Sequence, residues 1–168
     1  MIIRSETQLD YETIAEVNIL AFGRDNEAKL IENIRHTQNY IPELSLIAEL
    51  AGKIVGHILF SYIDLVAEQT LPILSLAPIA VHPQFQNQGI GSELVKTGLE
   101  IADSKGEALV IVLGHPDFYP RFGFQPAVNY QIESPFPVPE EVFMVKTLRN
   151  YQDKYRGKVV YPPAFLNV

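Results

Sequence analysis

The chain has 168 residues, 47% hydrophobic and 20% charged, a composition typical of a globular protein and not of a disordered or fibrous one. Its formal net charge of −7 argues against nucleic acid as a partner, because a phosphate backbone attracts positively charged surfaces. The absence of cysteine excludes disulfides, thiolate metal ligands and a cysteine nucleophile. For this length we expect a single domain over residues 1–168.

The first half of the chain is expected to form a strand, two helices and a strand hairpin. Apolar residues recur at helical spacing after Asp10 and again before His36, and an Ala51-Gly52 turn separates two strand-like runs. The predicted elements are a strand at residues 1–6, a helix from a cap at Asp10 to about residue 22, a helix at 27–36, and strands at 44–50 and 53–64.

A strongly apolar segment at residues 73–81 is expected to be a central strand. Pro78 lacks an amide hydrogen, so it predicts a bulge or a splayed edge within that strand. The remaining predicted elements are a helix within residues 86–105 that ends at Gly106, strands at 108–114, 124–127, 131–133 and 142–148, a single turn at 118–122, a proline-rich loop at 135–139, and an apolar tail at 157–165 that packs back on the domain. This order predicts an α/β fold with a mixed sheet flanked by helices.

The most informative segment joins the strand that ends at Val81 to the helix that Gly89 and Gly91 open. Glycines let consecutive amide hydrogens turn into one concavity, and at a helix N-terminus such donors suit a phosphate or diphosphate. A dinucleotide-binding fingerprint fails because Leu94 stands at its third glycine, and a P-loop fails because no lysine follows Gly91. A tight turn without a ligand is the remaining alternative.

Two motifs together identify a family. Gln86-x-x-Gly89-x-Gly91 resembles the phosphate-binding signature of the GNAT superfamily of N-acetyltransferases, and Tyr119-Pro-Arg-Phe-Gly123-Phe124 resembles its second signature. The resemblance implies a GNAT-like acyl-CoA N-acyltransferase fold, acetyl-CoA as donor substrate and an unidentified amine as acceptor. It also implies direct attack of the amine on the thioester.

The resemblance assigns the donor site to two segments. The backbone amides of the glycine loop hold the CoA diphosphate, and the main chain of the preceding strand bonds the pantetheine arm as an added strand would. The implied donor-binding residues are Ile79, Ala80, Val81, Gln86, Gln88, Gly89, Ile90, Gly91 and Ser92. An amide of Ala80 or Val81 is also expected to polarise the thioester carbonyl. Arg121 or Lys96 is a candidate for the CoA 3′-phosphate, with a solvated surface charge as the alternative.

Tyr119 is the implied general acid. A phenol with a pKa of about 10 is protonated at neutral pH and can donate a hydrogen bond to the leaving thiolate, whose thiol has a pKa of about 8.5. The sequence departs from the family pattern before this tyrosine, where Gly114-His-Pro-Asp117 replaces a longer helical turn. His115 therefore stands where many relatives place an asparagine, and it is a candidate for contacting the pantetheine arm of the donor or for acting as a base, with a cap on the strand end as the alternative.

The acceptor amine needs to lose a proton, since an alkylammonium with a pKa of about 10.4 is almost fully charged at pH 7. Some relatives carry a glutamate on the strand before the loop, whereas residues 73–81 offer only Ser75 as a polar side chain. The candidate bases are Glu49, His57, Asp64 and His115. The histidines show no ligand-type spacing, so we expect no metal.

A second hypothesis from another class is an acyl-CoA-binding regulatory or interaction module with weak or no turnover, and a third is an acyl donor longer than acetyl. Thiol release from acetyl-CoA distinguishes the enzyme from the module. No secretory signal and no membrane-spanning apolar run are visible, so we expect a cytoplasmic protein without a membrane partner. Either a monomer or a homodimer fits the sequence.

Overall fold

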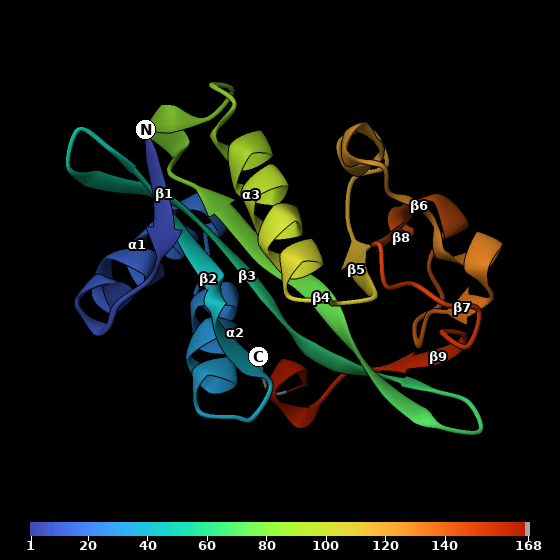
Figure 1. The fold of residues 1–168 in the computed structure, drawn as a ribbon. Helices are drawn as coiled ribbons and strands as arrows, with labels where there is room; N and C mark the ends of the chain where they lie inside the picture. The colour runs from blue at the N-terminus through green and yellow to red at the C-terminus, as the bar shows by residue number, and fades with distance from the viewer. Residues whose placement is uncertain (167–168) are drawn as a thin grey trace.

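The computed structural model describes residues 1–166, and within them nine strands form one twisted sheet (Figure 1). The strands are β1 (Ile2–Ser5), β2 (Tyr40–Leu50), β3 (Lys53–Val66), β4 (Thr70–Val81), β5 (Leu109–Leu113), β6 (Gln125–Pro126), β7 (Ile132–Glu133), β8 (Phe143–Thr147) and β9 (Gly157–Val160). Their order is β1-β2-β3-β4-β5-β8-β6, and β9 pairs with both β3 and β7. Among the strand pairs of residues 1–166, only β4–β5 and β7–β9 are parallel, which confirms the predicted mixed sheet.

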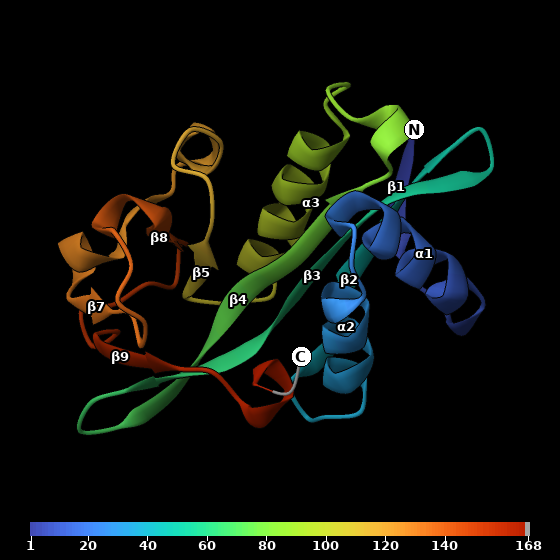
Figure 2. The same ribbon diagram turned by 180° about the vertical axis from the view of Figure 1, so that it is seen from behind.

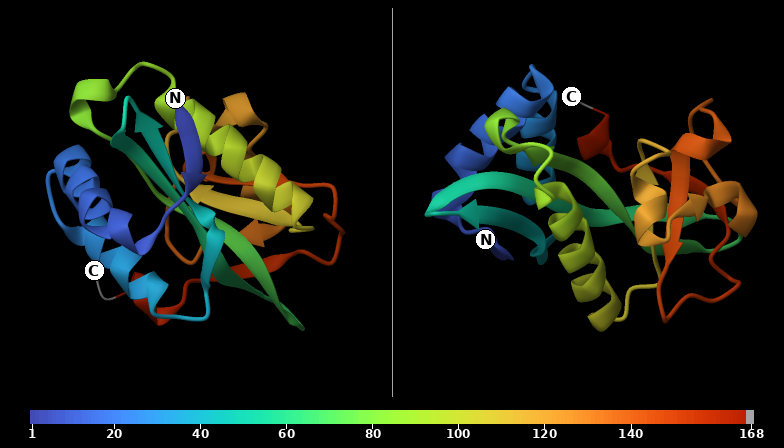
Figure 3. Two further views of the ribbon diagram at one scale, coloured as in Figure 1. Left: turned by 60° about the vertical axis from the view of Figure 1, so that its left-hand side comes forward. Right: turned by 90° about the horizontal axis from the view of Figure 1, so that it is seen from above.

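Helices cover both faces of the sheet (Figures 2 and 3). Helices α1 (Tyr11–Phe22) and α2 (Asn26–Arg35) lie on one face, and α3 (Ile90–Ser104) lies on the other. Leu59 and Phe60 follow each other on β3 and therefore point to opposite faces. Leu59 packs with the apolar side of α1 and α2, while Phe60 packs with that of α3. The two faces thus have separate cores that share the central strands.

The feature that positions the site is the divergence of β4 from β5. Strand β4 pairs with β3 from one end to the other, with a register shift opposite Pro78. With β5 it pairs only at Leu74 with Val110 and at Ser75 with Ile111. Beyond Ser75 the two strands separate, so the bulge and the splayed edge predicted from Pro78 are both confirmed.

Three local predictions need correction. Helix α1 begins after Asp10 as expected, but the Asp10 side chain makes no cap bond; its carboxylate accepts hydrogen bonds from Arg4 and from the Thr7 amide instead, each at 2.7 Å. The strand predicted at 124–127 is shortened to β6, because a 3-10 turn begins at Ala127. The tail packs back as expected, but it does so partly as a strand, β9, which the sequence did not indicate.

A buried polar cluster ties α2 to the sheet. The Glu6 carboxylate accepts two hydrogen bonds from Arg35, each 2.9 Å long, one from the Tyr40 hydroxyl at 2.6 Å, and one from His57 Nε2 at 3.2 Å. Although burial opposes it, these hydrogen bonds hold the pKa of Glu6 below its ordinary value. Burial lowers the pKa of His57, whose ring is fully enclosed, and Ser45 Oγ lies 2.9 Å from the same Nε2. The cluster therefore carries an ionised carboxylate beside a neutral imidazole.

We expect Glu6→Gln to destabilise the fold by about 3 kcal/mol, because it leaves the buried Arg35 guanidinium with only the exposed Glu32 carboxylate, 3.5 Å away, as a counter-charge. The pKa of Glu6 is depressed on folding, so the stabilisation is present above the unfolded value of about 4.3 and is lost as the pH falls below it. Urea denaturation between pH 3 and pH 7 measures both effects. Glu43→Gln is the matched control, since Glu43 pairs with Lys105 at the surface; equal behaviour of the two variants would contradict this account.

Candidate functional site

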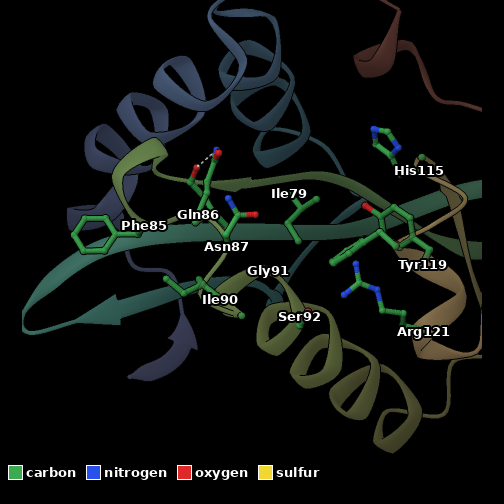
Figure 4. Close-up of a pocket in the computed structure, with 14 residues that line it drawn as sticks. Ile79, Phe85, Gln86, Asn87, Ile90, Gly91, Ser92, His115, Tyr119 and Arg121 are labelled. Atoms are coloured by element: carbon green, nitrogen blue, oxygen red, sulfur yellow. Dashed lines mark hydrogen bonds between the residues drawn. The ribbon is translucent and has the colours of Figure 1, made fainter.

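A cavity of about 770 Å³ lies where β4 and β5 diverge, beside the N-terminus of α3 (Figure 4). It brings together segments that are far apart in the sequence: the end of β4, the loop before α3, and the turn after β5. Of the residues predicted from the sequence, those that line the cavity are Ile79, Val81, Gln86, Gly89, Ile90, Gly91, Ser92, His115, Tyr119 and Arg121. Ala80 and Gln88 do not line it.

The N-terminus of α3 presents unpaired amide hydrogens to the cavity. Gly89 precedes the helix with φ of 84°, a conformation that favours glycine, and the first helical hydrogen bond runs from the Glu93 amide to the Gly89 carbonyl at 3.1 Å. The amides of residues 90–92 therefore have no acceptor within the helix and lie at the positive end of its dipole. Such a terminus suits an anion.

The loop before α3 also contains residues that the sequence analysis missed. Asn87 has φ of 63° and lines the cavity, as does Phe85. Asparagine tolerates this left-handed conformation better than most residues. An asparagine directly before Gln88-Gly89 is therefore the sequence signal that could have identified residue 87 as part of the turn. Figure 4 shows the Asn87 side chain beside that of Gln86.

The exposed edge of β4 offers main-chain groups to the cavity. The His82 amide donates to the Val55 carbonyl of β3 at 2.8 Å, and Ala80 is paired with His57. Because successive residues of a strand alternate in direction, the amides of Ile79 and Val81 face away from β3 and into the gap. Gln86 Nε2 donates to the Val81 carbonyl at 3.1 Å (Figure 4). Of the two amides predicted to polarise a carbonyl, only that of Val81 faces the cavity.

Tyr119 closes the inner end of the cavity. Its ring makes edge-on contacts with Phe118 and Phe124, at centroid separations of 5.0 and 5.5 Å, and its side chain is almost fully buried. Burial raises the pKa of Tyr119 to about 12. In Figure 4 the hydroxyl points towards β4. The phenol is therefore protonated over the whole physiological range and directed into the gap.

Charged groups at the rim differ in their access to the cavity. Arg121 lines it, held across the Phe118 ring at 5.0 Å, with Nε donating to the Asp117 carbonyl at 3.4 Å. Lys96 lies outside it and pairs with Glu93 at 3.8 Å on the exposed side of α3. Arg121 is thus the better placed of the two candidates for a phosphate.

The four candidate bases are not equivalent. Glu49 forms an ion pair with Arg4 at 3.2 Å, and His57 is enclosed in the cluster around Glu6. Asp64 lies on β3, where its strand partner is Val160 of β9. None of these three lines the cavity. His115 does, as an exposed side chain at the rim. Geometry leaves His115 as the one candidate with access.

A second, smaller cavity of about 260 Å³ lies beside the same divergence, and we call it the tail pocket. Its walls come from β4, from β5, from the proline-rich loop and from the C-terminal segment; the residues are Ser75, Leu76, Ala77, Leu113, Phe136, Tyr161, Phe165 and Leu166. Leu113 lies two residues after Ile111 on β5 and points to the same face as Ile111, the face away from α3. Ile79, Val81 and Tyr119, which line the larger cavity, pack with the core beneath α3. The two cavities therefore approach the gap from opposite sides of the sheet.

Within residues 1–166, no group of three or more His, Cys, Asp or Glu side chains is arranged to hold a metal ion. In the same part of the chain, no helix combines the length and apolar character that crossing a membrane requires.

The chain is similar in sequence to a known family of enzymes. A family model described as an acetyltransferase (GNAT) domain matches residues 42–126. Two proteins of Escherichia coli strain K12, both named uncharacterized N-acetyltransferases, are similar in sequence. YjhQ is 41% identical over 134 residues, which cover 79% of this chain and 74% of YjhQ, and YhbS is 34% identical over 149 residues, which cover 88% and 87%.

Two solved structures are similar to this chain over nearly its whole length. The crystal structure of the GNAT family N-acetyltransferase YhbS from Escherichia coli in complex with CoA matches with a TM-score of 0.88 and 31% identity, over 99% of this chain and 92% of that one. A GNAT family acetyltransferase from Brucella melitensis in complex with acetyl-CoA gives a TM-score of 0.80 and 27% identity, over 98% and 97%. The family and the fold predicted from the two sequence motifs are confirmed.

We expect Gly114→Ala to displace the Tyr119 ring, because a Cβ at residue 114 would lie 2.5 Å from Tyr119 Cε2. The substitution is expected to destabilise the protein by about 1–3 kcal/mol, the usual effect of overpacking. Urea denaturation of a double-mutant cycle with Tyr119→Ala measures the coupling. In the Tyr119→Ala background the effect of Gly114→Ala is expected to vanish; an unchanged effect there would show that the ring is not the neighbour that matters.

Proposed function

This chain belongs to the GNAT family of N-acetyltransferases, and we propose that it transfers the acetyl group of acetyl-CoA directly to an amine, with Tyr119 as the general acid. The observation that carries the proposal is the convergence in one cavity of three features: the free amides that open α3, the edge of β4 that β5 leaves unpaired beyond Ser75, and the buried phenol of Tyr119. Each feature suits a different part of the donor or of the reaction.

The donor is a diphosphate joined to a long amide-containing arm that ends in a thioester. The amides of residues 90–92 would hold the diphosphate, since helix N-termini bind phosphate through free donors and the dipole. The main chain of Ile79 and Val81 would pair with the amide-containing arm as an added strand. Arg121 would meet the 3′-phosphate at the rim. This arrangement directs the thioester into the gap, next to Tyr119.

The reaction follows from the groups that surround this position. The amine nitrogen attacks the thioester carbonyl carbon, and the Val81 amide stabilises the developing oxyanion. Collapse of the intermediate breaks the carbon–sulfur bond, and the electron pair leaves on sulfur while Tyr119 donates a hydrogen bond to it. With the pKa of Tyr119 at about 12 and that of a thiol at about 8.5, complete proton transfer is uphill by about 3.5 units. Tyr119 therefore acts chiefly by stabilising the thiolate, and His115 accepts the proton released by the amine.

A binding module without turnover is the second candidate function, and one observation favours it. None of the described residues that line the donor cavity is a carboxylate. The buried phenol favours the enzyme, because a module that only holds CoA has no need of a proton donor at the thioester.

We expect Tyr119→Phe to lower kcat for thiol release by about 100-fold or more, the usual contribution of a positioned acid, while the affinity for CoA changes little. Release of free CoA is followed with a thiol reagent, and binding is followed by calorimetry. Tyr130→Phe is the matched control, since this ring packs on Tyr151 and not against the cavity. Full activity of Tyr119→Phe would remove the phenol from the mechanism.

The pH profile provides an independent check. The pKa of Tyr119 is raised to about 12, so its active protonated form persists at every pH below that value. The acceptor amine becomes a better nucleophile as it loses its proton. We therefore expect kcat/KM to rise from pH 7 to pH 10 without a descending limb from the phenol. A fall that begins below pH 10 in the wild type but not in Tyr119→Phe would contradict this assignment.

A further inference from the structure

We propose that the tail pocket binds the acceptor and selects amines that carry an aromatic or other apolar group, with Phe136 and Tyr161 as specificity-determining residues. This inference rests on the proposed acetyl transfer and adds the class of acceptor to it. It is carried by the position of the pocket, by the chemistry of its walls and by its size.

The position suits a second substrate. The β4–β5 ladder ends at Ser75, and the residues just beyond the last pair divide between the two cavities. Ala77 lines the tail pocket, whereas Ile79 lines the donor cavity. No ladder between β4 and β5 seals the gap at this point. A molecule seated among the tail residues can therefore extend an amine into the gap that receives the thioester from the other side.

The walls are aromatic and uncharged. The Phe136 and Tyr161 rings stack with a centroid separation of 5.7 Å and an interplanar angle of 15°, and Phe165 follows at 5.1 Å from Tyr161. None of the described residues that line the pocket carries a charge. A carboxylate on the acceptor, or a second ammonium group, would have no partner among them and would lose its hydration. An apolar group fits these walls.

The size of the pocket limits its occupant. A water molecule occupies about 30 Å³ in the liquid, so a volume of about 260 Å³ holds roughly nine groups of that size. A phenyl ring with a short aliphatic chain is about that large. The walls are part of the fold: β9 pairs with β3 at Val160 and Asp64, and Phe165 packs against the core beneath α2. A pocket built in this way is formed before its ligand arrives.

The test is an acceptor panel with matched amines: 2-phenylethylamine and hexylamine as apolar acceptors, ethanolamine and putrescine as polar ones. Thiol release from acetyl-CoA is measured for each. We expect kcat/KM for 2-phenylethylamine to exceed the values for ethanolamine and putrescine by at least about tenfold, the effect of a few buried methylene groups. Equal or better turnover of the polar amines would overturn this inference and leave the proposed acetyl transfer intact.

A variant places the preference in the tail pocket. Phe136 is 42% exposed, so Phe136→Glu is tolerated by the fold and adds a carboxylate to an uncharged wall. We expect it to raise KM for 2-phenylethylamine about tenfold and to lower KM for putrescine, with CoA affinity unchanged. Leu20→Glu, at a 47% exposed position on α1, is the control for added charge and is expected to behave as wild type.

The outcomes separate the two proposals. An unchanged preference in Phe136→Glu would exclude the tail pocket as the acceptor site, although acetyl transfer would stand. Saturable CoA binding without thiol release for any of the four amines would overturn the proposed function and this inference with it.

Discussion

The separation of β4 from β5 after only two paired residues is the constraint on which the rest of this structure depends. Main-chain groups of a strand need partners, and the edge of β4 beyond Ser75 has none from β5. A ligand with amide groups along its length can satisfy that edge. The same divergence leaves room on both faces of the sheet, where the donor cavity and the tail pocket lie.

Helix α3 turns this gap into a site of defined geometry. Its apolar side packs on the sheet in the core around Phe60, and Tyr119 belongs to the same core. The free amides and the Tyr119 hydroxyl are therefore parts of one packed frame, although they belong to segments about thirty residues apart in the sequence. Gly114 completes the frame, because the Tyr119 ring occupies the space that any larger residue would need.

Much of the fold and of the donor cavity could be predicted from the sequence, because the residues that determine them are close together in the chain. A proline inside an apolar strand predicts a break in its ladder, and glycines before a helix predict free amides at its start. Two short motifs, at Gln86–Gly91 and Tyr119–Phe124, were enough for the family, and the elements follow the expected order with small shifts at their ends.

Long-range pairing could not be predicted in this way. Glu6 meets Arg35 and His57 across separations of 29 and 51 residues, and nothing beside these residues in the sequence indicates a buried cluster. For the same reason the sequence could not exclude His57 as a base, whereas the structure excludes it because the ring is enclosed beside Glu6. The tail pocket depends on β9 crossing to β3, so its aromatic walls at Phe136 and Tyr161 carried no signal of their own.

Amide hydrogen exchange with and without CoA tests the central claim most directly, since it reports on individual main-chain groups. The amides of residues 90–92 have no acceptor within α3, and those of Ile79 and Val81 face the gap. Our account predicts that saturating CoA slows exchange at these positions and leaves the amides of β8 unchanged. Tight binding of CoA that leaves both the start of α3 and the edge of β4 unprotected would contradict it.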